Sequence, residues 1–150
     1  MQPGPPFEQV YTIDDWYDGP IAGFASYHGR PHHYRAVFQG YEDAWDRDEE
    51  YFDLVLVSDE TLRSAIEAKE IFDRWDAARR QGAVVWTAGD DSTFGALPKD
   101  RERYQHLRTM LAPYADAGDA RGRVVRGDFS PDSTQVRWID VSDTAPSNDR

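Results

Sequence analysis

The chain has 150 residues, no cysteine and a net charge of −11, with 28 Asp and Glu against 17 Lys and Arg. A protein that binds nucleic acid through its phosphates needs a basic face, so this charge argues against a nucleic-acid partner and is compatible with a basic protein partner. The longest apolar stretches, residues 54–57 and 83–86, are far shorter than the roughly 20 residues of a membrane-spanning helix, so no membrane partner is expected.

Length and composition predict a single domain over residues 1–150. Domains are most often roughly 100–150 residues long, and an aromatic content of 13% supplies large rings for a core. The absence of cysteine excludes thiol catalysis and Cys-ligated zinc, and it favours a reducing compartment. Since the N-terminus shows no signal-peptide pattern, we expect a cytoplasmic protein. The Pro- and Gly-rich residues 1–7 and the polar residues 142–150 are expected to be flexible tails.

Four strands are predicted in the first part of the chain, at residues 10–16, 21–27, 32–38 and 51–57. β-Branched and aromatic residues recur there between turn residues. Residues 18–20 (Asp-Gly-Pro) form the first turn, and residues 28–31 (His-Gly-Arg-Pro) form a tight hairpin connection. Gly23, inside the second strand, indicates a bend or a close backbone approach. We expect residues 51–57 to pair antiparallel with residues 32–38.

The clearest helix begins at Ser58 or Asp59, which can cap its first turn, and ends at Gly82. Trp75 continues the apolar stripe of this helix and is therefore expected to be buried. Pro98 is well placed to open a second helix, and strands at residues 123–129 and 135–141 close the chain. This order predicts an α+β fold, in which a curved, barrel-like antiparallel sheet of about six strands carries two helices, the first packed on its apolar face.

The histidines around the hairpin turn are the first candidates for chemistry. His28, His32 and His33 lie close together in sequence, and imidazoles act as bases near neutral pH or as zinc ligands. His32 shares a strand face with Tyr34, so the two side chains are candidates to line a binding pocket. The spacing lacks the helix and the intervening Glu of a zinc-protease pair, and we predict no metal and no cofactor. The alternative is that these histidines are ordinary structural residues.

Acidic residues are concentrated in the first part of the chain, since residues 1–60 carry 13 acids and three Arg. Asp14, Asp15 and Asp18 suit a turn better than a catalytic pair, because Asp before Gly-Pro bonds its own backbone. Residues 42–50 hold many carboxylates without the offsets of an EF-hand loop. Trp45 lies among them and is a candidate interface anchor. The alternative is a solvated loop with Trp45 folded onto the core.

Residues 15–23 read DWYDGPIAG, and residues 29–32 read GRPH. Both stretches resemble a group of small uncharacterised bacterial proteins, in which a YDGP turn leads to a Gly-containing strand and a G-(K/R)-P-H hairpin. The aromatic helix around residues 72–75 and the Leu-Pro step at residues 97–98 are also similar. The resemblance covers about residues 10–140 and implies a bacterial origin and an intact fold. No activity is established for the group, so it carries no catalytic residue over.

We therefore expect a non-enzymatic acidic binding protein, immunity-like or regulatory, with a basic protein as its partner. One alternative is a small-ligand binding domain, and another is an enzyme with a His/Asp site near residues 28–33. The sequence contains no phosphate loop, dinucleotide fingerprint or nucleophile elbow, which ranks the enzyme last. The candidate binding residues are His28, His32, Tyr34 and Trp45.

Overall fold

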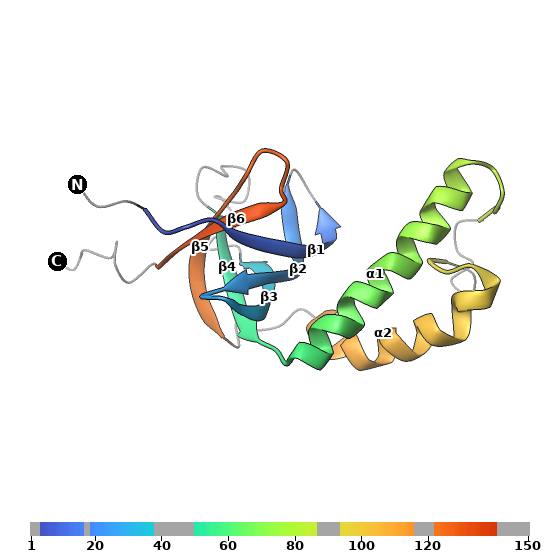
Figure 1. The fold of residues 1–150 in the computed structure, drawn as a ribbon, viewed down its shortest axis with the longest axis horizontal. Coiled ribbons are helices and arrows are strands. Elements are labelled where there is room, and N and C mark those ends of the chain that lie inside the picture. Colours follow the sequence, from blue (N-terminus) through green and yellow to red (C-terminus); the bar gives the residue numbers. More distant parts are fainter. Residues whose placement is uncertain (1–3, 17–18, 38–49, 87–93, 116–121, 141–150) are drawn as a thin grey trace. The chain divides into compact units, whose positions relative to one another are not determined.

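A computed structural model of the chain describes residues 4–16, 19–37, 50–86, 94–115 and 122–140. The chain divides into two compact units (Figure 1). The barrel unit consists of residues 1–58 and 118–150, and the helical unit consists of residues 59–117. Whether the two units unfold together, as a single domain would, stays a prediction.

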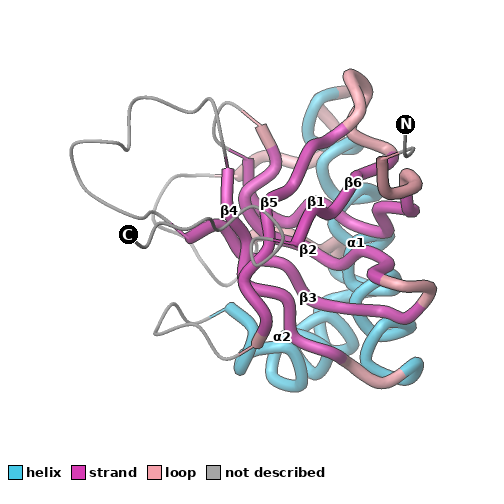
Figure 2. The backbone as a smooth tube through the Cα atoms, turned by 90° about the vertical axis from the view of Figure 1, so that its left-hand side faces the viewer, coloured by secondary structure: helices cyan, strands magenta, loops and turns pink. Residues whose placement is uncertain are grey.

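The described part of the barrel unit is an antiparallel sheet closed into a barrel of six strands (Figures 1 and 2). Its strands are β1 (Glu8–Trp16), β2 (Pro20–Tyr27), β3 (Arg30–Val37), β4 (Glu50–Leu56), β5 (Arg123–Phe129) and β6 (Gln135–Asp140). Each strand pairs with the next, and β6 closes the barrel on the start of β1. The predicted α+β class, barrel-like sheet and antiparallel pairing of β3 with β4 are all confirmed.

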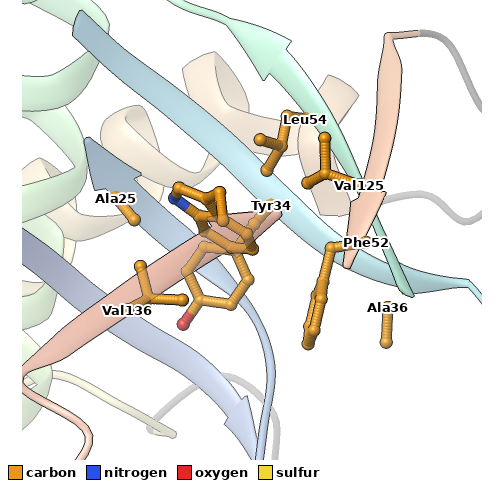
Figure 3. Close-up of a cluster of buried hydrophobic side chains, with 8 residues drawn as sticks. Ala25, Tyr34, Ala36, Phe52, Leu54, Val125 and Val136 are labelled. Carbon is orange, nitrogen blue, oxygen red and sulfur yellow. The ribbon is translucent and has the colours of Figure 1, made fainter. Parts of the chain in front are cut away.

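The apolar face of the sheet forms the interior of the barrel. Figure 3 shows side chains from several strands meeting there. The rings of Tyr34, Phe52, Phe129 and Trp138 lie with their centroids 5.6–6.0 Å apart. The face that carries Phe52 and Leu54 therefore lies inside the barrel, among side chains from other strands. The packing of the first helix on the sheet concerns the placement of the two units and stays a prediction.

The hairpin between β2 and β3 is tighter than the sequence suggests. Tyr27 pairs with Arg30, so the turn consists of His28 and Gly29, and β3 begins two residues earlier than predicted. Both turn residues have positive φ (54° and 77°), which is typical of a type I′ turn, whose twist matches that of the flanking strands. The close approach predicted at Gly23 is confirmed, because a Cβ there would overlap the Thr12 carbonyl and lie 2.7 Å from the Tyr34 hydroxyl.

The helical unit contains α1 (Asp59–Arg80), η1 (Pro98–Asp100) and α2 (Arg101–Ala115). α1 ends at Arg80, two residues before Gly82, which has a φ of 80°, and the Ala83 N–H donates to the Ala78 carbonyl as in a Schellman motif. Trp75 is 2% exposed, which confirms its predicted burial. Its ring packs in an aromatic cluster with Phe72, Trp86 and Phe94. No helix within the described ranges is long and apolar enough to cross a membrane.

Candidate functional site

A ring of polar side chains lies at the end of the barrel that carries the β2–β3 turn, where β1, β3 and β5 begin and β2, β4 and β6 end. Each residue of this ring lies two positions along its strand from a residue that belongs to the barrel core or packs against it. Because side chains alternate between the two faces of a strand, each residue of the ring lies on the inward side of its strand. This hairpin-end cluster consists of Glu8, Tyr27, His32, Arg123 and Asp140.

Tyr27 bridges two strands that are not neighbours in the sheet. Its hydroxyl donates a hydrogen bond to Asp140 Oδ1 at 3.1 Å, and Arg123 Nε donates to the same oxygen at 3.1 Å. Because β1 lies between β2 and β6, the Tyr27–Asp140 bond spans the barrel end. Burial raises the pKa of Tyr27, and the bond to Asp140 raises it further, so the phenol stays a neutral donor. The Tyr27 side chain and its bond thus cover part of the apolar core at this end.

Two of the three candidate histidines meet on Tyr27. The ring centroid of His28 lies 4.2 Å from that of Tyr27, and the ring of His32 lies edge-on to Tyr27 at 5.1 Å. His32 Nδ1 is 2.9 Å from the Arg30 carbonyl, which can only accept, so Nδ1 carries the proton. Burial lowers the pKa of His32, which favours the neutral ring. Its Nε2 therefore has a lone pair that can accept a hydrogen bond from a ligand.

Glu8 fixes the hairpin turn to the first strand. Its carboxylate accepts hydrogen bonds from Ser26 Oγ at 2.8 Å, the His28 N–H at 2.9 Å and the Gly29 N–H at 3.0 Å. Burial alone would raise the pKa of Glu8, but the hydrogen bonds from Gly29, His28 and Ser26 together lower it. A positive φ is uncommon for a residue other than glycine, so Glu8 helps to hold His28 in that conformation.

The other candidate residues lie elsewhere. Tyr34 is fully buried one step deeper in the barrel, and its hydroxyl donates to the Thr12 carbonyl at 3.1 Å, so it belongs to the core. His33 is also buried, with its ring edge-on to Phe24. Trp45 falls outside the residues that the structure describes. The structure thus brings His28 and His32 together but separates both from Tyr34.

In the hairpin-end cluster, the imidazole of His32 and the carboxylate of Asp140 bond partners other than one another. His32 bonds the Arg30 carbonyl, while Asp140 accepts from Tyr27 and Arg123, so imidazole and carboxylate are each held by other partners. In the described ranges, no group of three or more His, Cys, Asp or Glu is arranged to hold a metal ion. An acceptor nitrogen beside aromatic rings can orient a small polar ligand.

Sequence reasoning missed Glu8, Tyr27, Arg123 and Asp140. The alternation within each strand places Tyr27 and Asp140 on inward faces, and that signal was present in the sequence. Their meeting depends on closure of the barrel and on the register between strands, which no local pattern contains. The sequence could therefore have shown that each residue faces inward on its own strand, but not that these residues meet in one cluster.

The two units differ in net charge, and an exposed aromatic side chain lies at the end of the barrel opposite the β2–β3 turn. The barrel unit contains 17 Asp and Glu, eight Arg and no Lys, a net charge of −9, whereas the helical unit holds 11 acids and nine bases, a net charge of −2. Asp14, Asp15 and Trp16 are exposed at the end of β1, and Trp16 is 58% exposed. The acidic residues 42–49 lie outside the described ranges.

Comparison of the chain with protein-family models, curated proteins and solved structures finds no match. The function is therefore inferred from the charge distribution and from the geometry of the two barrel ends.

Proposed function

We propose that the protein is a non-enzymatic acidic binding protein of the cytoplasm whose barrel unit docks a basic protein partner. The observation that supports this proposal is the division of charge, −9 on the barrel unit against −2 on the helical unit. A field of one sign on one unit steers an oppositely charged partner towards that unit. General solubility would be served equally well by charge spread over both units.

The exposed side chain of Trp16 gives this acidic surface a means of holding a partner after encounter. Exposed charges mainly accelerate association, whereas buried aromatic anchors mainly slow dissociation. Trp16 lies beside Asp14 and Asp15, so steering and anchoring groups are adjacent in the chain. Trp45, among the acids of residues 42–50, is proposed as a second anchor of the same kind.

Charge variants of the two units test the proposal. The protein is immobilised, basic proteins from the source cell are captured at low salt, and each captured protein is purified and its binding reconstituted. The barrel variant carries Asp48→Asn, Glu49→Gln and Glu50→Gln, and the matched helical variant carries Glu60→Gln, Glu70→Gln and Glu102→Gln at exposed positions. We expect association with the barrel variant to be about tenfold slower at 50 mM salt, and association with the helical variant to match that of the wild type.

The same purified partner separates steering from anchoring. Trp45→Ala should mainly accelerate dissociation, with little dependence on salt, because a buried apolar contact is not screened. Partners without a basic charge, or equal association rates for the barrel and helical variants, would overturn the proposal. If Trp45→Ala instead lowers thermal stability and leaves both rates unchanged, Trp45 belongs to the core and not to the interface.

A second candidate function, binding of a small polar ligand, is favoured by the acceptor Nε2 of His32 beside the rings of Tyr27 and His28. A fragment screen by NMR would test it, with uncharged hydrogen-bond donors as probes. Shifts should cluster on His28 and His32 and disappear in His32→Phe, which keeps a flat ring but removes the acceptor. Hits that shift only residues elsewhere in the chain would reject this function.

A further inference from the structure

One buried hydrogen-bond donor of the helical unit has no acceptor among the described residues. Trp75 is 2% exposed, and its Nε1–H makes no hydrogen bond to any residue that the structure describes. The large majority of buried side-chain polar atoms in native proteins are hydrogen-bonded, and a buried indole N–H usually has a partner. Because an unpaired buried donor is destabilising, a molecule that offers an acceptor to this N–H would stabilise the unit.

Aromatic rings surround the Trp75 indole. The ring centroids of Phe94, Phe72 and Trp86 lie 4.9, 5.6 and 6.4 Å from a Trp75 ring centroid. These three residues are half-buried, so each is partly accessible, whereas Trp75 lies beneath them. A molecule that reaches the Trp75 N–H would therefore contact aromatic surface around its hydrogen-bonding atom, which favours a ligand with an apolar body.

The charged groups beside these rings are already neutralised. Lys69 Nζ and Arg79 Cζ each lie 5.5 Å from a ring centroid of the cluster. Lys69 pairs with Asp73 at 2.9 Å, and Arg79 pairs with Asp76 at 2.8 Å. An anionic ligand would meet a carboxylate beside each cation, and a cationic ligand would meet the cation, so the surroundings favour an uncharged ligand.

We propose that the aromatic cluster of the helical unit, Phe72, Trp75, Trp86 and Phe94, binds a compact uncharged ring compound that carries a carbonyl oxygen. The Trp75 Nε1–H donates to that oxygen, and the other rings pack against the ligand body. Trp86 lies in a segment without helix or strand, so its ring can swing aside to admit the ligand without breaking a helix. The proposal concerns the helical unit alone and is independent of the basic partner proposed for the barrel unit.

Acetophenone is the probe, and α-methylstyrene, in which a methylene group replaces the carbonyl oxygen, is its matched control. Binding to the full-length protein is followed by the indole N–H signals in proton–nitrogen correlation spectra. The chain has five Trp, and the signal that disappears in Trp75→Phe is that of Trp75. We expect acetophenone to move this signal downfield and to bind about fivefold more tightly than α-methylstyrene, because only acetophenone accepts a hydrogen bond.

Two variants separate the hydrogen bond from ring packing. Trp75→Phe keeps a ring but removes the donor, so acetophenone should bind this variant no more tightly than α-methylstyrene does. Trp86→Phe removes an indole of the same cluster but keeps the Trp75 donor, so the preference for acetophenone should persist. If either variant fails to fold, the comparison of the two probes on the wild type decides the question by itself.

Several results would overturn the proposal. Equal affinity of the wild type for the two probes would do so, as would no binding of acetophenone or binding that leaves the Trp75 signal unmoved. An upfield Trp75 Nε1–H signal that neither probe moves would place the N–H on the face of a neighbouring ring. A nuclear Overhauser contact between this N–H and water that persists at saturating acetophenone would show that water is the acceptor. Each of these results leaves the charge-based proposal for the barrel unit standing.

Discussion

Replacement of Glu8 by Gln tests whether this carboxylate holds the hairpin end of the barrel together. Gln keeps one acceptor oxygen but replaces the other with an NH2 group, which cannot accept the bonds from the turn N–H groups or Ser26. Hydrogen bonds to a charged group contribute about 1.5–3 kcal/mol each, and partial exposure reduces this. We therefore expect Glu8→Gln to lower the free energy of unfolding of the barrel by about 1–2 kcal/mol at pH 7.

The pH dependence of this loss provides a sharper criterion. The pKa of Glu8 is lower in the folded protein than in the unfolded chain, so its stabilisation is fully present above the unfolded pKa, near 4.3, and is lost as the pH falls through the folded pKa. The difference between wild type and Glu8→Gln should therefore shrink below about pH 4. Below about pH 4 the unfolded chain binds more protons than the folded protein does, so the free energy of unfolding decreases as the pH falls.

Native-state hydrogen exchange of core amides in β4, β5 and β6 reports the stability of the barrel unit by itself. Glu70→Gln, an exposed position on α1, is the matched control and should leave barrel exchange unchanged. Equal stability of Glu8→Gln and wild type at pH 7, or a difference that persists undiminished to pH 3, would refute the role given to the Glu8 carboxylate.

Three further substitutions test the packing. Trp75→Ala should lower the free energy of unfolding, measured by urea melts, by about 3–5 kcal/mol. The control Val85→Ala, at an 86% exposed position, should change the free energy of unfolding by less than about 0.5 kcal/mol. A loss under about 1 kcal/mol for Trp75→Ala would mean that the aromatic cluster is misassigned. Gly23→Ala should lower the melting temperature by several degrees, because the added methyl group meets the Thr12 backbone, and an unchanged value contradicts that contact. Tyr27→Phe removes the bond across the barrel end and should cost about 1 kcal/mol by amide exchange near the hairpin; undiminished protection there would show that the bond contributes nothing.

Local features of the fold were predictable because local chemistry determines them. The period-two alternation in β3 and β4 identified both strands and their pairing. Gly82 stopped α1 because a helix commonly ends at a glycine of positive φ. Gly23 signalled a close contact because a strand interior otherwise favours a side chain. In each case a few neighbouring residues contained the whole signal.

Features that depend on contacts distant in sequence were not predictable in the same way. The pattern of β4 shows an apolar face, but it cannot say whether a helix or a closed barrel covers that face. The cluster around Tyr27 needs Glu8 from the first strand and Asp140 from the last. His32 and Tyr34 share a strand face, but they lie at different depths in the barrel. The imidazole of His32 is half-exposed, whereas the phenol of Tyr34 is buried in the core. These assignments required the register of the whole sheet.

The dependence of association rate on salt, measured by stopped flow with a purified basic partner, tests the central claim most directly. Wild type, the barrel variant and the helical variant are compared from 50 to 300 mM salt, across which the Debye length falls from about 14 Å to about 6 Å. If the barrel unit steers the partner, the wild-type rate falls steeply with salt, the barrel variant starts lower with a flatter slope, and the helical variant follows the wild type. Three coincident salt profiles would contradict the claim that the acidic barrel unit is the binding unit.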